Sequence, residues 1–282
     1  RKSASCWPPD LSAAGNWRAM VEAEEAQTNE LRSDDRADYW QGLSSLFKQD
    51  PRRTDDPDVA VLSKFVDAES TVIDVGAGAG RVALPLSLKS RKVVAVEPSA
   101  AMCKDLRELT AEYEIDNVDV VESTWEEASI EPADVAFSAH VVYTVRDIAG
   151  FLEKMTKSAR KTAAVIVWIR APLYSLGPLW RDVYGIERLN LPAFPELLEV
   201  LWEMGVEPQV ELGPPRSQRG FPDKEAAFEM LRQRLFIGDS RAELLEKLRG
   251  SIERRMVQVE DGWMLGETPL RAPILVHWLG RA

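Results

Sequence analysis

Three glycines, Gly76, Gly78 and Gly80, stand at alternate positions directly after an apolar run that ends at Val75. The run predicts a buried strand, and the apolar segment that follows the glycines predicts a helix starting near Arg81. In an open α/β sheet, such a turn lies at the carboxyl edge of the strands, where ligands bind. Glycine adopts positive φ and carries no Cβ, so a ligand can approach its backbone closely. The spacing therefore predicts a ligand-binding turn.

Two classes of ligand use a turn of this kind, and the spacing of the glycines separates them. The dinucleotide fingerprint has the form G-x-G-x-x-G. Counted from Gly76 and Gly78, its third glycine would fall at Arg81. The G-x-G-x-G spacing seen here therefore disfavours a dinucleotide.

The segment DVGAGAG, from Asp74 to Gly80, resembles the first motif of the class I S-adenosylmethionine-dependent methyltransferases. Glu97, at the end of the apolar run VVAVE, matches the second motif, in which a carboxylate accepts hydrogen bonds from both ribose hydroxyls. The resemblance covers residues 56–170 and implies S-adenosylmethionine as the cofactor. We expect the carboxylate of Glu97 to be unpaired without cofactor and to add little to the stability of the fold.

Three further segments resemble the cofactor site of this family. The residues after Glu97 match its adenine side, VVESTWEEA matches the segment that flanks the adenine, and the end of ADVAFSAH matches the lining of the methionine end. Thr124 stands where family members often carry Asp. The resemblance implies that the cofactor is contacted by Asp74, Gly76, Ala77, Gly78, Gly80, Glu97, Pro98, Ser99, Met102, Thr124, Trp125, Ser138, Ala139 and His140.

The chemistry of methyl transfer makes modest demands on the protein. Displacement at a sulfonium methyl group is in line, so the enzyme mainly has to align the acceptor and exclude water. A general base is needed only where the acceptor must lose a proton. His140, after the predicted fourth strand, would either act as that base or merely present its backbone, and Tyr143 is the other candidate catalytic residue. His277 lies within ILVHWLG and is interpreted as a buried histidine of the sheet.

Absent motifs narrow the choice of acceptor. The segment SAHV, residues 138–141, is not the (Asn/Asp)-Pro-Pro-Tyr run by which amino-methylating enzymes position a planar nitrogen. Cys103 is not in the Pro-Cys motif of cytosine C5 methylation. A small-molecule acceptor is therefore favoured over protein or RNA, and no metal is expected. The candidate acceptor-side residues are Tyr39, Trp40, Trp168 and Arg170.

The elements that must position these residues alternate between strand and helix from residue 57 onward. Short continuous apolar runs predict strands at 71–75, 92–97, 118–121, 134–138, 163–169, 206–213 and 272–280, with a possible short strand around GWMLG. Amphipathic patterns predict helices at 57–67, 81–89, 99–113, 147–159, 195–204, 222–236 and 240–256, and two or three more within 16–49. The pattern is typical of an α/β fold with a doubly wound, seven-stranded, mostly parallel sheet of the Rossmann-like methyltransferase type.

Three regions follow from this division of the chain. Residues 1–55 are predicted to form a helical lid over the cofactor, and residues 56–170 the cofactor-binding core. Residues 171–282 are predicted to complete the sheet and to carry a helical insertion whose segments at 171–204 and 214–262 cover the acceptor. Their sequence does not indicate the chemistry of that acceptor.

Composition limits the partners of the chain. The net charge of −11 over 282 residues disfavours nucleic acid and anionic lipid as partners. Two cysteines without metal-ligand spacing suit a reducing compartment. No apolar stretch is long enough for a membrane span or resembles a signal peptide, so we expect a cytoplasmic protein. The sequence does not indicate an oligomeric state.

Two other functions remain open at this point. A nicotinamide-dependent oxidoreductase of Rossmann type would use the same turn for a pyrophosphate, although Arg81 disfavours it. A non-catalytic module that binds S-adenosylmethionine would keep every motif named above.

Overall fold

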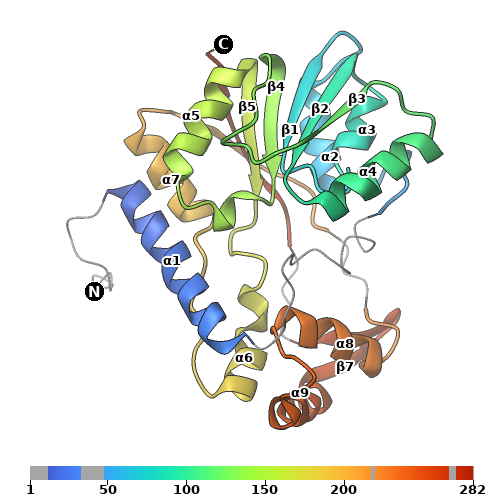
Figure 1. The fold of residues 1–282 in the computed structure, drawn as a ribbon, viewed down its shortest axis with the longest axis vertical. Helices are drawn as coiled ribbons and strands as arrows, with labels where there is room; N and C mark the ends of the chain where they lie inside the picture. Colours follow the sequence, from blue (N-terminus) through green and yellow to red (C-terminus); the bar gives the residue numbers. More distant parts are fainter. Residues whose placement is uncertain (1–11, 33–47, 217–219, 267–270, 282) are drawn as a thin grey trace.

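The structure is a computed structural model that describes residues 12–32, 48–216, 220–266 and 271–281 (Figure 1). Its sheet has the strand order β3-β2-β1-β4-β5-β9-β6. Within the described ranges, β9 pairs antiparallel with β5 and with β6, and the other pairs of neighbouring strands in this sheet are parallel. The strands are β1 (Thr71–Val75), β2 (Lys92–Glu97), β3 (Val118–Glu122), β4 (Ala133–Ala139), β5 (Ala159–Val167), β6 (Gln209–Leu212) and β9 (Ile274–Leu279). This confirms the predicted doubly wound sheet, whose order reverses between β1 and β4.

Helices cover both faces of the sheet because its strands are apolar on both sides. In β1, Val72 packs into one hydrophobic cluster and Ile73 into the other, as the alternation of side chains along a strand requires. The cluster around Val72 includes α2 (Pro57–Leu62), α3 (Ala83–Ser87) and α4 (Ala100–Glu112). The cluster around Ile73 includes α1 (Ala13–Leu31), α5 (Ile148–Ser158) and α7 (Phe194–Glu203).

A smaller unit has a hydrophobic core of its own. It consists of α6 (Gly177–Tyr184), α8 (Lys224–Arg234), α9 (Ala242–Arg255) and the hairpin of β7 (Met256–Val259) and β8 (Gly262–Leu265). Trp180 and Leu248 are completely buried in it. In Figure 1 this unit lies below the sheet, at the end where the parallel strands finish. It therefore stands beyond the carboxyl edge that the glycine-rich turn occupies.

The elements depart from the predicted ones at a few places. The helix expected at 240–256 ends at Arg255, because Met256 begins β7 and pairs with Leu265. The strand expected from 163 begins already at Ala159, where it pairs with Ala133 of β4. The helix α6 was not anticipated, because Pro and Gly around it read as a loop. Of the N-terminal helices, α1 is described, whereas the predicted acceptor-side residues Tyr39 and Trp40 lie outside the described residues.

The predicted division into a lid, a core and an acceptor-covering region stays a prediction. Helix α1 lies along α5 and α7, where Trp17 is fully buried and its indole Nε1 donates to the Val145 carbonyl at 2.8 Å. Helix α7, inside the range 171–204, packs on the sheet, whereas α6 belongs to the smaller unit.

None of the helices in the described ranges combines the length and apolarity that crossing a bilayer demands.

Candidate active site

The glycine-rich turn connects β1 to α3 and leaves open space at Gly78. Gly78 has φ of +57°, and a Cβ placed there would meet only the Sδ atom of Met102, at 4.0 Å. At Gly80, in contrast, a Cβ would collide with the side chains of Leu106 and Leu84. Gly80 thus serves the packing of α3 and α4 against the turn. Gly78 instead keeps a space clear beside α4.

Glu97, at the end of β2, holds this turn in place. Its Oε2 atom accepts a hydrogen bond from the Gly78 nitrogen at 2.9 Å, and its Oε1 atom accepts one from the Ser99 nitrogen at 2.8 Å. Ser99 in turn caps α4, accepting from the Met102 nitrogen at 3.3 Å. The expectation of an unpaired carboxylate was therefore wrong, because the chain itself supplies donors from the turn and from the start of α4.

Asp74 lies in β1 just before the turn and is buried. Burial raises the pKa of Asp74 to about 8, with the charge of Glu97 adding to the rise and that of Arg81 opposing it. Its carboxyl group accepts a hydrogen bond from the backbone of Ala83, at the start of α3. Asp74 therefore joins the strand to the helix as a largely neutral acid at pH 7.

The other predicted cofactor residues lie at the same edge, but several of their side chains bond within the chain. The indole of Trp125 is buried, its Nε1 donating to the Phe151 carbonyl at 3.2 Å. The fully buried Ser138 donates to the Val75 carbonyl at 2.9 Å and so ties β4 to β1. Thr124 Oγ1 accepts from the Glu127 nitrogen at 3.3 Å. The remaining positions are Gly76 and Ala77 in the turn, Pro98 after β2, and Ala139 at the end of β4.

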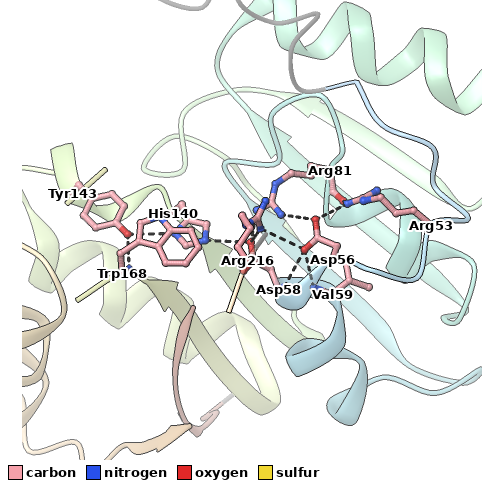
Figure 2. Close-up of polar contacts among 9 residues, drawn as sticks. All are labelled: Arg53, Asp56, Asp58, Val59, Arg81, His140, Tyr143, Trp168 and Arg216. Carbon is pink, nitrogen blue, oxygen red and sulfur yellow. Dashed lines mark hydrogen bonds and ion pairs between the residues drawn. The ribbon is translucent and has the colours of Figure 1, made fainter. Parts of the chain in front are cut away.

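His140 follows β4 and makes contacts on both ring nitrogens (Figure 2). Its Nε2 lies 3.1 Å from Asp58 Oδ2, and its Nδ1 lies 3.3 Å from the hydroxyl of Tyr143. That hydroxyl accepts a 2.7 Å hydrogen bond from the Trp168 nitrogen, so its own proton points to Nδ1. Nε2 then carries the ring proton and donates it to Asp58. The ring also stacks on Trp168, with 4.2 Å between centroids.

The protonation states agree with this hydrogen-bond chain. Burial lowers the pKa of His140, against the opposing effect of Asp58, so the ring is neutral at pH 7. Burial raises the pKa of Tyr143 well above its ordinary value, so the hydroxyl keeps its proton. Burial also acts to raise the pKa of Asp58, but the hydrogen bond and charge of His140, with Arg81 and Arg216, hold it far below its ordinary range.

A cluster of buried charges extends from Asp58, and analysis of the sequence missed it. Arg81 donates to Asp56 Oδ2 at 2.8 Å and to Asp58 Oδ2 at 2.5 Å (Figure 2). Arg53 also donates to Asp56 Oδ2 at 2.8 Å, and Arg216 donates to Asp58 Oδ2 at 2.8 Å. The cluster thus joins the segment before α2, the glycine-rich turn and the segment after β6.

One signal of this cluster was available in the sequence. Asp56 directly precedes Pro57, a combination that marks a helix N-cap followed by its first residue. Asp56 does cap α2, accepting from the Asp58 nitrogen at 2.9 Å. Arg53 is a local partner of Asp56, but Arg81 and Arg216 come from distant parts of the chain, and no local pattern indicates them. The segment DPRRTDDPD therefore read as a charged linker.

The two described residues predicted on the acceptor side are placed differently. Trp168 is buried between His140 and Arg216, whose guanidinium carbon lies 5.7 Å from its ring centroid. Arg170 is exposed and lies over the ring of Tyr174, at 5.4 Å. The structure thus brings Trp168 to His140 and Tyr143, and leaves Arg170 at the surface. The Cys103 thiol donates to the Glu97 carbonyl at 3.2 Å, and burial raises the pKa of this thiol to about 11, so it is protonated at pH 7.

The residues present fit S-adenosylmethionine as the cofactor. The space that a side chain at position 78 would fill is free, and Glu97 and Met102 border it. According to the motifs, Gly78, Glu97 and Met102 would hold the ribose and adenine parts of the cofactor. Among the described residues, no group of three His, Cys, Asp or Glu side chains is arranged to hold a metal ion.

Comparisons with known proteins support a methyltransferase domain. Residues 73–165 match the family model described as "Methyltransferase domain". A putative methyltransferase from Bacillus halodurans superposes with a TM-score of 0.54 at 15% identity, covering 80% of this chain and 100% of that one. YcgJ from Bacillus subtilis superposes with a TM-score of 0.53 at 13% identity, covering 79% and 98%. At such identities the solved structures establish the fold alone, and no curated protein matches the sequence.

Proposed function

We propose that the chain, whose residues 73–165 match a methyltransferase domain, is a class I S-adenosylmethionine-dependent methyltransferase that methylates a small molecule at the carboxyl edge of its sheet. The observation that carries this proposal is the smaller unit of α6, α8, α9, β7 and β8, which stands beyond that edge (Figure 1). We propose that this unit covers the site, which would leave less room for a protein or RNA chain than for a metabolite. The net charge of −11 further disfavours RNA.

The bound cofactor would supply an electrophilic methyl group on a sulfonium. The chain has to align the acceptor with the bond between this methyl group and sulfur, and has to exclude water. The turn at Gly78, fixed by Glu97, would hold the cofactor at the ends of β1 and β2. Residues at the ends of β4 and β5 would hold the acceptor. The buried ring of Trp168 excludes water from that side.

We assign His140 and Tyr143 a positioning role in this reaction. Both ring nitrogens of His140 are engaged, one by Asp58 and one by Tyr143, and Tyr143 also binds the backbone of Trp168. The chain of bonds fixes the end of β4 relative to the end of β5. A general base at His140, as considered from the sequence, would have to give up one of these bonds to take a proton from an acceptor.

Transfer of a radiolabelled methyl group into a cell extract tests the proposed acceptor class. The protein is incubated with labelled S-adenosylmethionine and with the low-molecular-mass, protein and RNA fractions separately, and the Gly78→Val variant serves as the inactive control. We expect label in the low-molecular-mass fraction with the wild type only. Label confined to protein or RNA would refute a small-molecule acceptor.

A further inference from the structure

Two arginines face each other where the chain continues β6 and precedes β9. Arg216 and Arg271 form an isolated antiparallel bridge, in which the backbone nitrogen of Arg216 donates to the backbone carbonyl of Arg271 at 2.7 Å. Residues directly opposite in an antiparallel pair project to the same face, where like charges are destabilising. Such a pair needs compensation by negative charge on that face.

Only one member of this pair receives such compensation within the described part of the chain. Arg216 is paired with Asp58 at 2.8 Å and lies 3.5 Å from Asp56. Arg271 donates to the Pro172 carbonyl at 2.7 Å and to Ser175 Oγ at 2.8 Å, both of them neutral acceptors. No carboxylate of the described residues forms an ion pair with Arg271.

A third arginine adds to the positive charge. Burial lowers the pKa of Arg271, and the nearby Arg234, in the last turn of α8, lowers it further. Arg234 also has no ion pair among the residues that the structure describes. Two guanidinium groups that form no ion pair with a described carboxylate, in a protein of net charge −11, indicate a local site for an anion.

Arg271 adjoins the acceptor side of the candidate active site. Arg216, its partner in the bridge, lies over the ring of Trp168, with 5.7 Å between its guanidinium carbon and the ring centroid. Its partners Pro172 and Ser175 belong to the segment that follows β5, between the sheet and α6. An anion bound there would lie between the carboxyl edge of the sheet and the smaller unit.

We propose that the methyl acceptor carries an oxyanion, a carboxylate or a phosphate, that binds to Arg271 with Arg234 beside it. The planar guanidinium of arginine matches both groups by donating two parallel hydrogen bonds. Binding would place a negative charge beside guanidinium groups that no described carboxylate pairs with, and would orient the acceptor. This inference rests on the proposed small-molecule acceptor.

Titration with inorganic phosphate and with acetate tests the anion site without any turnover. The perturbation of nuclear magnetic resonances of the protein reports binding to the wild type and to the Arg271→Met, Arg234→Met and Arg249→Met variants. Arg249 is the control, an exposed arginine of α9 that is paired with Glu225. Circular dichroism and cofactor titration show that each variant is folded.

We expect Arg271→Met to weaken anion binding at least roughly tenfold, the loss of one charge-assisted pair, and Arg234→Met to weaken it less. Arg249→Met should leave it unchanged. Equal anion affinity in the wild type and both of the first two variants would overturn the proposal.

The chemistry of the labelled products separates this inference from the proposed function. Labelled small molecules are passed over an anion exchanger after the transfer reaction. Retention of the label supports an anionic acceptor. Label in small molecules that the exchanger does not retain overturns the inference while the proposed function stands. Label in protein or RNA alone overturns the proposed function and, with it, this acceptor class.

Discussion

Glu97 Oε2 accepts a hydrogen bond of 2.9 Å from the backbone nitrogen of Gly78, 19 residues earlier in the chain. The residue expected to bind the ribose is therefore also the residue that holds the cofactor turn. Its other oxygen binds the start of α4 through Ser99. We therefore expect a change at Glu97 to act on the turn and, through the predicted ribose contact, on the cofactor.

Replacement of Glu97 by glutamine should weaken cofactor binding by roughly tenfold to a few hundredfold. One carboxylate oxygen becomes a neutral acceptor, and the other is replaced by an amino group that donates. The melting temperature of the cofactor-free protein should also fall, because the bond to Gly78 or to Ser99 is lost. Calorimetry and thermal melts measure the two effects. Glu122→Gln is the matched control, since Glu122 pairs with Glu97 in the register of β2 and β3 but is exposed. Unchanged affinity for Glu97→Gln would contradict the ribose contact.

Replacement of Gly78 by valine should abolish cofactor binding, because the side chain would fill the space beside Met102. The variant should remain folded, with a loss of about 1 to 3 kcal/mol for a β-branched residue at positive φ. Gly185→Val controls for this strain, since Gly185 has φ of +75° and no atom within 4 Å of an added Cβ. The two variants should melt at similar temperatures, and only the Gly78 variant should fail to bind in isothermal titration. Normal binding by Gly78→Val would mean that the turn has no cofactor role.

Replacement of Arg81 by methionine should destabilise the protein by about 3 to 5 kcal/mol, because it leaves the buried carboxylates of Asp56 and Asp58 partly uncompensated. Urea unfolding measures the loss. Arg107→Met is the comparison, since Arg107 forms an exposed pair with Glu122 that contributes little. Equal stability of the two variants would show that the buried cluster does not contribute to the fold.

The stability contributed by Asp74 should fall as the pH rises. The pKa of Asp74 is about 8 in the folded protein, above the value of about 3.9 in an unfolded chain. Between these two pH values the folded protein therefore keeps a proton on Asp74 that the unfolded chain has released. The contribution is fully present below about pH 4 and is lost toward pH 8. Asp74→Asn keeps the shape of the neutral acid, so its stability relative to the wild type should rise between pH 5 and pH 8. Chemical unfolding at several pH values measures the difference, and a constant difference would exclude the raised pKa.

Asp134, at the start of β4, should show the opposite dependence. The backbone hydrogen bond from Thr71 lowers the pKa of Asp134 to about 2, so its contribution is present above about pH 4 and is lost as the pH falls toward 2. Asp134→Asn should therefore be less stable than the wild type at pH 7, with the difference shrinking in acid. A difference that grows in acid would contradict this assignment.

The pH dependence of Tyr143→Phe separates positioning from base catalysis at His140. The tyrosine hydroxyl donates to the neutral imidazole, so its removal raises the pKa of His140. If both residues position the strand ends, kcat should fall several-fold with an unchanged pH profile. An acidic limb that moves to higher pH in the variant would identify His140 as the base. Tyr174→Phe is the control, since Tyr174 is an exposed tyrosine after β5.

The local sequence alone determined the sheet and the cofactor edge. Continuous apolar runs such as VVAVE can be buried on both faces only in a covered sheet, and glycines at alternate positions after β1 permit the positive φ angles of the turn. The separation of Gly78 and Glu97 along the chain was likewise readable, because both belong to one strand–helix–strand unit.

Contacts between distant segments were decided by the tertiary structure. Asp58 meets His140 and Arg216, 82 and 158 residues away, and the burial that shifts the pKa values of these groups exists only once the segments pack. The same holds for Arg271, whose neighbours Arg216 and Arg234 come from different elements. Charge and residue type are properties of the sequence. Whether a charge is solvated, paired or left facing a ligand depends on which elements the fold brings together around it.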